Sequence, residues 1–299
     1  MIKPLLLKKT SRKDNLHYFI KWLIDWYLRK QSRQYLAAGK KQLIGYSFDL
    51  QMHRINLFGA YDARELSVFI EYLTLSNPES FDGEFIDIGA NIGNHSIFFS
   101  NYFRKVHSFE PNKKTFSILK FNSVLANNIT CYEEGLSDAD GRAVLTEPYG
   151  FPGCSSITQE NEPGDSIAIR KLDSIIGRFE NVSLIKIDVE GHELNVLQGG
   201  VELIKKYMPY ILFEQHAHEF DANGDSKVLT FIRTLGYTSF AMIREYPRAN
   251  KKNSINILRY TYNAIARLIL GSKIKVEIKE NFLHEFYPFL IAIPPKKSK

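Results

Sequence analysis

The chain has 299 residues, of which 44% are hydrophobic and 24% are charged. These values are ordinary for a soluble globular protein and exclude the collagen-like, disordered and disulfide-scaffold classes. The cysteines Cys131 and Cys154 form no CxxC pair, and no apolar run approaches the ~20 residues that span a bilayer. We therefore expect a cytoplasmic protein without a zinc site.

The net charge of +6 is unevenly distributed along the chain. Residues 1–54 carry 12 Lys/Arg against 3 Asp/Glu, and residues 248–299 carry 11 against 3, whereas residues 55–247 carry 16 against 27. Basic ends on an acidic body argue against a nucleic-acid groove. They fit peripheral contact with an anionic membrane or a partner, and the alternative is that the charges are simply solvated.

Residues 1–60 are expected to form a basic, helical N-terminal extension. Its helical stripe consists of Leu16, Phe19, Ile20, Leu23 and Tyr27, with Trp22 and Trp26 nearby. A second basic amphipathic segment is expected as an insert at about 248–282. Each segment could pack on the core or on the partner in a homodimer, or it could dock on anionic lipid.

The region between these ends alternates strand and helix patterns. Strands are expected at 84–89, 105–110, 129–133, 166–172, 184–188, 210–214, 237–244 and 286–293, and helices at 94–103, 111–127, 194–208 and 228–235. Asp173 is expected to cap a short helix. The stretch 138–164 is rich in Gly, Pro and Ser, which predicts loops and short hairpin strands. This alternation predicts an α/β fold with a doubly wound parallel sheet covered on both faces.

Polar residues and glycines follow the first two strands. The first strand is followed by a turn that contains Gly89, Asn91 and Gly93, and ligands of such sheets lie beyond the carboxyl ends of the strands. The glycines let the backbone approach a ligand, and the next helix points free N–H groups at it. Glu110 ends the second strand, where it suits the two hydroxyls of a ribose. The alternative for Glu110 is a charge at a helix start.

The turn does not suit a nicotinamide dinucleotide. The motif G-x-G-x-x-G would need glycines where the chain has Asn91 and Asn94, and a side chain at the second position obstructs the pyrophosphate. Asp87 favours a positively charged amino group instead. The pocket therefore suits a nucleoside with an amino-acid tail, such as S-adenosylmethionine, and disfavours an NAD-dependent oxidoreductase.

Five segments together resemble the successive motifs of the FkbM family of methyltransferases. They are FIDIGANIG (85–93), SFEP (108–111), GLSD (135–138), KLDSI (171–175) and IKIDVEGHE (185–193). The resemblance implies a class I methyltransferase (Rossmann-like) fold over residues 61–299, with seven strands of which the last is antiparallel. It also implies S-adenosylmethionine as the donor and a hydroxyl of a sugar or natural product as the small-molecule or glycan acceptor. The alternative is a non-catalytic binding module on the same fold.

The resemblance also assigns cofactor-binding residues. They are Asp87, Gly89, Asn91 and Gly93 for the methionine part, Glu110 for the ribose, Ser137 and Asp138 for the adenine, and Asp188. Asp138 is equally a candidate for a turn residue before Gly141.

The catalytic candidates are Asp188, Glu190, His192 and His216. His192 is the first choice for the general base, because imidazole titrates near neutral pH and a helix start disfavours its protonated form. Glu190 and His216 follow, and the alternative for His192 is a residue that only hydrogen-bonds Glu190. Glu193 is expected to brace the glycine turn. Asp188, Glu190 and Glu214 could bind a divalent cation, but we expect no metal dependence.

Overall fold

The computed structural model describes residues 12–146, 156–158, 164–246, 262–263, 265–266, 268–269 and 271–295. Cys154 and residues 248–261, 264, 267 and 270 of the insert expected at about 248–282 lie outside this part of the chain. The chain divides into two compact units. Unit 1 comprises residues 1–42 and 46–61, and unit 2 comprises residues 43–45 and 62–299.

The described residues of unit 1 form two helices, α1 (Arg12–Ala37) and α2 (Leu50–Phe58). The Asp49 carboxylate caps α2 by accepting from the Gln51 N–H at 3.2 Å. Tyr35 ties the helices together, because its hydroxyl donates to the carbonyl of Leu57 at 2.6 Å. No helix among the described residues has both the length and the apolar character that crossing a bilayer requires.

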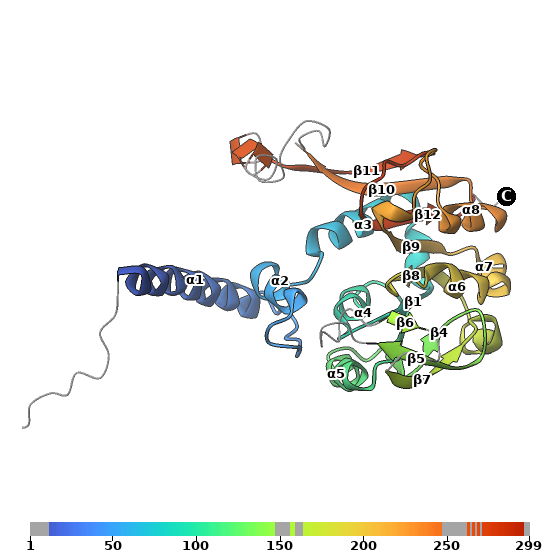
Figure 1. The fold of residues 1–299 in the computed structure, drawn as a ribbon, viewed down its shortest axis with the longest axis horizontal. Helices are drawn as coiled ribbons and strands as arrows, with labels where there is room; N and C mark the ends of the chain where they lie inside the picture. Colours follow the sequence, from blue (N-terminus) through green and yellow to red (C-terminus); the bar gives the residue numbers. More distant parts are fainter. Residues whose placement is uncertain are drawn as a thin grey trace, which may run out of the picture. The chain divides into compact units, whose positions relative to one another are not determined.

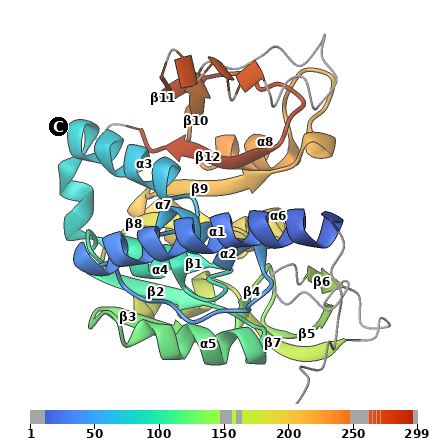
Figure 2. The ribbon, with the colours of Figure 1, turned by 90° about the vertical axis from the view of Figure 1, so that its left-hand side faces the viewer.

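Unit 2 is built on a twisted sheet with the strand order β11-β10-β12-β9-β8-β1-β2-β3 (Figure 2). The strands are β1 (Glu84–Ile88), β2 (Lys105–Phe109), β3 (Ile129–Tyr132), β8 (Val182–Ile187), β9 (Tyr210–Gln215), β10 (Ser239–Tyr246), β11 (Lys273–Lys279) and β12 (Tyr287–Ile293). Strands β3, β2, β1, β8 and β9 are parallel, whereas β12 is antiparallel to both β9 and β10. The expected doubly wound fold with an antiparallel last strand is confirmed.

Helices cover both faces of this sheet. Figure 1 shows α3 (Ala63–Ser76) and α4 (Asn94–Phe99) on one side, with α6 (Glu193–Gln198), α7 (Val201–Tyr207) and α8 (Lys227–Thr234) on the other. The helix α5 (Lys113–Ser123) packs against β3. Neighbouring residues of a strand point to opposite faces, so that Phe85 joins the core under α3 and Ile86 joins the core under α6 and α7.

A second, smaller sheet occupies the region where short hairpin strands are expected. Its strands are β4 (Gly135–Leu136), β5 (Gly141–Thr146), β6 (Ser156–Thr158) and β7 (Asp165–Arg170), in the order β4-β7-β5-β6. Strand β5 is antiparallel to β6 and β7, and β4 is parallel to β7. This sheet positions Ser137, which follows β4 directly.

The expected single helix over 194–208 is wrong, because Gly199 and Gly200 separate α6 from α7. A Cβ atom at Gly199 would lie 1.9 Å from the carbonyl oxygen of Ser137, so the chain needs glycine here. The expected role of Asp173 is also wrong. Its carboxylate accepts from the N–H groups of Glu202 at 3.0 Å and Leu203 at 2.9 Å, and therefore caps α7 rather than its own short helix, η4 (Asp173–Arg178).

Three other expectations need correction. The main sheet has eight strands and not seven, because β11, which lies within the expected insert, pairs antiparallel with β10. The helix expected over 94–103 ends at Phe99. The helix expected over 111–127 spans only Lys113–Ser123. It starts later because Asn112 is its cap and accepts from Lys114 N at 3.0 Å, which leaves Pro111 outside.

A largely buried cluster of polar side chains from β1, β2 and β3 lies near the amino-terminal end of β1. The His107 ring is fully buried, with Nε2 3.3 Å from Glu84 Oε2 and Nδ1 3.0 Å from the Tyr132 hydroxyl. Arg104 also donates to Glu84 at 2.9 Å. Burial lowers the pKa of His107 to about 4, although Glu84 opposes the shift. The ring is therefore neutral at physiological pH.

Candidate active site

The candidate site lies at the carboxyl ends of β1, β2, β8 and β9. These four strands are parallel, so the residues that follow them gather at one edge of the sheet. The structure brings together the expected residues of the glycine turn, Glu110 and Asp188 at this edge. It also shows two separate polar clusters, one around Ser137 and one around Glu214.

The turn after β1 uses backbone conformations that few residues adopt. Gly89 has φ +73°, and a Cβ atom there would lie 1.9 Å from the carbonyl oxygen of Asp188. Asn91 follows with φ 50°, which is uncommon for a residue with a side chain, and Gly93 precedes α4 with φ +89°. The Oδ1 atom of Asn91 is buried and has no hydrogen-bond partner among the described residues. The turn therefore offers an acceptor to a ligand.

The buried side-chain amide of Asn122 forms a hydrogen bond to this turn. Asn122 of α5 donates to the carbonyls of Ile92 and Ile44, both at 2.8 Å, and its Oδ1 accepts from Ile44 N at 2.8 Å. Asn122 thus links the turn to the 43–45 segment of unit 2. This link could not be predicted from the sequence, because Asn122 lies within a helix pattern.

Asp87 lies in β1 next to the turn and is fully buried. Its Oδ2 accepts from the Ser96 hydroxyl at 2.6 Å, and Ser96 lies 2.7 Å from the hydroxyl of Ser108. Its Oδ1 has no hydrogen-bond partner in the described part of the chain and lies 3.6 Å from Lys186 Nζ. One carboxylate oxygen of Asp87 is therefore also available as an acceptor.

Lys186 was missed in the sequence and is central to the electrostatics of the site. Its side chain is 3% exposed, and Nζ donates to Asp188 Oδ2 at 3.0 Å. Burial alone would lower the pKa of Lys186, but the carboxylates of Asp188 and Asp87 outweigh it and raise the pKa. In the same way, burial would raise the pKa of Asp188, but Lys186 reverses the shift and lowers it. The lysine is thus a buried cation between two carboxylates.

Glu110 closes the other side of the turn. Its Oε2 accepts from Asn91 N at 2.9 Å and its Oε1 accepts from Asn112 N at 2.8 Å. Burial raises the pKa of Glu110 to about 7, although these two backbone hydrogen bonds oppose the shift. A carboxylate with one hydrogen bond to each oxygen still has lone pairs for two further donors.

Ser137, Asp138 and His192 form the first of the two polar clusters. The Ser137 hydroxyl donates to Asp138 Oδ1 at 2.9 Å and lies 2.8 Å from His192 Nε2. This hydrogen bond lowers the pKa of Asp138, while burial lowers the pKa of His192. The His192 ring thus hydrogen-bonds Ser137. The alternative in which it hydrogen-bonds Glu190 is wrong. The base role of His192 stays a prediction.

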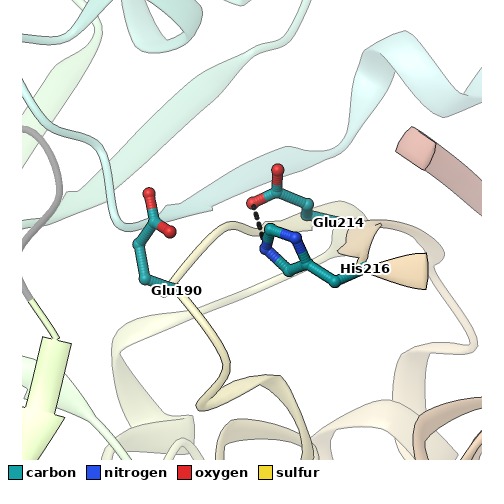
Figure 3. Close-up of side chains that lie close together, drawn as sticks. All are labelled: Glu190, Glu214 and His216. Carbon is teal, nitrogen blue, oxygen red and sulfur yellow. Dashed lines mark ion pairs between the residues drawn. The ribbon is translucent and has the colours of Figure 1, made fainter. Parts of the chain in front are cut away.

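Glu190, Glu214 and His216 form the second polar cluster, which Figure 3 shows. One ligand atom of each lies within 4.8 Å of the others, and His216 Nε2 lies 4.0 Å from Glu214 Oε2. The His216 side chain also accepts from the backbone N–H of Glu219, in a capping box at the start of η5 (Ala217–Glu219). This donor set could hold a divalent cation.

The carboxylates of this cluster differ in protonation. Burial, with Asp188 and Glu190 close by, raises the pKa of Glu214 to about 9. A hydrogen bond joins Glu214 to Asp188, so Glu214 is the protonated partner and donates to the Asp188 carboxylate. Partial burial also raises the pKa of Glu190, although the residue as a whole is exposed.

The turn that carries Glu190 is held in an uncommon conformation. Glu190 has φ 52° and Gly191 has φ +93°. The Glu193 carboxylate accepts from the N–H groups of Val189 and Gly191, both at 3.2 Å, and so braces the turn as expected. Non-glycine residues in the left-handed region cost of order 1–3 kcal/mol and cluster at functional sites.

The comparisons with known proteins agree with this architecture. A model of the methyltransferase FkbM domain matches residues 87–239, just over half of the chain. The hexuronic acid methyltransferase AglP of Haloferax volcanii is 32% identical over 137 residues, which cover 44% of this chain and 55% of AglP. Methyltransferase 1 of Beauveria bassiana is 26% identical over 159 residues, which cover 44% of this chain and 64% of that protein.

Among solved structures, methyltransferase FkbM from Methylobacillus flagellatus is 23% identical, with a TM-score of 0.34. That match covers 44% of this chain and 32% of the solved chain. The chain spans between about half and two thirds of the length of the curated relatives that it matches. The family match and the curated relatives favour a methyltransferase over a binding module or an oxidoreductase. The chain belongs to the FkbM family of methyltransferases.

Proposed function

We propose that this enzyme transfers a methyl group from S-adenosylmethionine to a hydroxyl group of a sugar. The observation that carries the donor assignment is the pair of buried acceptors, Asp87 Oδ1 and Asn91 Oδ1, that have no hydrogen-bond partner among the described residues. A buried polar atom without a partner is costly, so such atoms mark the place of a ligand donor. The ammonium group of the methionine part would supply the missing hydrogens.

The other residues of the site fit the same donor. Glu110 would bind the ribose hydroxyls through the free lone pairs of its carboxylate. Ser137 and Asp138 would meet the adenine, and His192 would position them through its contact with Ser137. Gly89 and Gly93 are required by the packing of the turn itself, since a Cβ atom would lie 1.9 Å from the carbonyl oxygen of Asp188 at Gly89 and 2.8 Å from the Leu119 side chain at Gly93.

S-adenosylmethionine supplies an electrophilic methyl group when it is bound. The protein must align the acceptor oxygen, exclude water and remove the hydroxyl proton. We assign the proton to Glu190, because its carboxylate lies in the cluster with Glu214 and His216, burial raises its pKa, and it belongs to a strained turn. His192 is less suited, since its Nε2 already contacts Ser137, and Glu214 already carries a proton.

A methyl ester of a hexuronic acid is the second candidate product, because one relative is named a hexuronic acid methyltransferase. A carboxylate acceptor needs no base, and it would meet the negative charges of Asp188 and Glu190. A hydroxyl acceptor suffers no such repulsion and needs a base, which Glu190 provides. The cluster therefore supports ether formation on a hydroxyl more than esterification.

The test is transfer of a radiolabelled methyl group from S-adenosylmethionine to a panel of neutral and uronic acid sugars. The product is then treated with mild alkali, which hydrolyses a methyl ester and leaves a methyl ether intact. We expect label that resists alkali, and a loss of roughly 100-fold or more in kcat for Glu190→Gln. Label that alkali releases would establish the ester, and failure of calorimetry to detect donor binding would overturn the donor assignment.

A further inference from the structure

The helix α1 exposes a continuous apolar face. Over the three turns from Leu16 to Tyr27 nine large apolar side chains are exposed, and seven of them, 42–62% exposed, share one side of the helix: Leu16, Phe19, Ile20, Trp22, Leu23, Trp26 and Tyr27. At 100° per residue they fall on one arc of about 160°. We refer to these seven residues as the apolar face of α1. Exposed apolar patches of this kind mark an interaction surface.

Unit 1 itself does not cover this face. The half-buried residues of α1 over 13–37 are Leu28, Gln31 and Tyr35, which lie towards its carboxyl end. Tyr35 contacts α2 through its hydrogen bond to Leu57. The seven residues of the apolar face thus stay exposed although α2 contacts the same helix.

Basic side chains lie along α1, and at 100° per residue Lys13, Lys30 and Arg33 fall on or beside the apolar face, whereas Lys21 falls on the opposite side. Lys13, Lys21, Lys30 and Arg33 are exposed, and Lys30 Nζ lies 5.8 Å from the centroid of the Trp26 ring. Arg29 is paired with Asp25 at 2.8 Å and adds little net charge. The surrounding residues 1–54 carry 12 Lys/Arg against 3 Asp/Glu. The charge of unit 1 is therefore complementary to an anionic surface.

We propose that α1 docks on an anionic membrane, with its axis in the plane of the surface. The apolar face enters the boundary between headgroups and acyl chains, and the basic side chains contact anionic headgroups. Trp22, Trp26 and Tyr27 suit this position, because an amphipathic ring is favoured at the membrane–water interface. Helices of the described residues do not cross a bilayer, so α1 lies on the surface.

A second copy of the chain fits this face less well. Pairing two copies would place one basic helix against another, whereas an anionic membrane neutralises the charge. The arc is also wider than the narrow seam that a two-stranded coiled coil uses. The membrane is thus the occupant that both the width of the face and its charge favour.

The experiment is co-sedimentation of the full chain with vesicles of phosphatidylcholine alone or of equal parts phosphatidylcholine and phosphatidylserine. We expect binding to the anionic vesicles, weakened by added salt. The variant Trp22→Ser/Trp26→Ser should lose at least about tenfold in affinity. The variant Lys30→Gln/Arg33→Gln should lose about 25-fold, since each basic residue near the surface contributes about fivefold. Circular dichroism verifies that the variants remain helical.

Phe121→Ser is the matched control, because Phe121 is an aromatic residue of α5 in unit 2 with 60% exposure, close to the 57% of Trp22. This control should bind vesicles as the unaltered chain does. The proposal is overturned if neither vesicle binds the chain, or if the tryptophan variant binds as well as the control. It is also overturned if light scattering shows a dimer that the tryptophan variant dissociates while vesicles bind neither form. None of these readouts requires a methyl donor.

Discussion

The charged residues of the site are coupled, because Lys186 lies between Asp87 and Asp188 and Asp188 in turn accepts from Glu214. Each carboxylate therefore has its own protonation state. Asp188 is ionised, Glu214 is protonated and Glu110 titrates close to neutral pH. These differences lead to two predictions at the scale of single residues.

The first prediction concerns Glu110 and the pH dependence of donor binding. Its pKa is raised to about 7, so the carboxylate is mostly ionised at pH 8 and mostly protonated at pH 6. If only the ionised form accepts from both ribose hydroxyls, affinity for S-adenosylmethionine falls about tenfold from pH 8 to pH 6. Isothermal titration calorimetry at both pH values measures this change.

The matched variant is Glu110→Gln, which keeps the shape of the side chain and removes its titration. Its affinity should be weaker at pH 8, and it should lack the part of the pH dependence that Glu110 causes. Parallel curves for the unaltered chain and the variant would show that Glu110 does not control donor binding.

The second prediction separates a protonated Glu214 from a metal ligand. An amide at this position donates to Asp188 as a protonated carboxyl does, so Glu214→Gln should retain more than half of kcat, and chelation with EDTA should leave the rate unchanged. Glu214→Ala, which removes the donor, should lose activity. A loss of roughly 100-fold in Glu214→Gln would instead indicate that Glu214 acts as a base or binds a cation.

Sequence patterns could predict the positions of several site residues but not their partners. The glycine turn, Glu110 and Asp188 were predictable, because residues at the carboxyl ends of parallel strands meet at one edge. Lys186 was not, because its apolar neighbours give no sign that its charge is buried. The contact of His192 with Ser137 joins residues far apart in the chain, and no spacing rule reports it.

At the scale of elements, the break between α6 and α7 positions Ser137. Gly199 has φ −77°, which any residue can adopt, so its requirement for glycine comes from the close carbonyl of Ser137 alone. Gly199→Ala should therefore destabilise the fold by about 1–3 kcal/mol through overpacking, and should weaken donor binding as Ser137 shifts. Urea unfolding and calorimetry measure the two effects.

Gly177→Ala is the control for this prediction. Gly177 is exposed in η4, its φ lies outside the left-handed region, and a Cβ atom there meets nothing within 4 Å. This variant should unfold at nearly the same urea concentration as the unaltered chain. Equal midpoints for both alanine variants would contradict the role of Gly199.

The break at Gly199 and Gly200 also shows what sequence patterns cannot predict at this scale. The apolar spacing from Leu194 to Met208 is continuous, because α6 and α7 bury the same side against the sheet. The spacing therefore predicts one helix, and the break follows from a contact with Ser137, the residue after β4, that only the folded chain shows. Strand β11 was missed for a related reason, since its alternate lysines weaken the strand pattern.

At the scale of the whole molecule, His107 makes stability depend on pH. Its pKa is about 4 in the folded chain and near 6.5 when unfolded, so the unfolded chain binds more protons between these values. Stability due to this group is therefore present at neutral pH and is lost as pH falls. The loss from pH 7 to pH 5 is about 2 kcal/mol.

The variant His107→Gln tests this contribution, because it removes the titrating ring. The free energy of unfolding in urea should fall less between pH 7 and pH 5 for the variant, by about 2 kcal/mol. The comparison isolates His107 from Glu110 and Glu214, whose raised pKa values have the opposite sign. An identical fall in both proteins would rule out the buried neutral ring as the source.

Strand β11, the additional strand of the main sheet, also determines which sheet edge the protein exposes to other molecules in solution. β11 is the outermost strand beside β10, and its alternate positions carry Lys273, Lys275, Glu277 and Lys279. A strand from another molecule could pair with the free edge of β11 only if it packed closely against these lysine side chains. Without β11 the sheet would end at β10, where the stretch from Phe240 to Met242 is buried and apolar. By pairing with β10, strand β11 thus covers an apolar sheet edge that would otherwise be prone to aggregation.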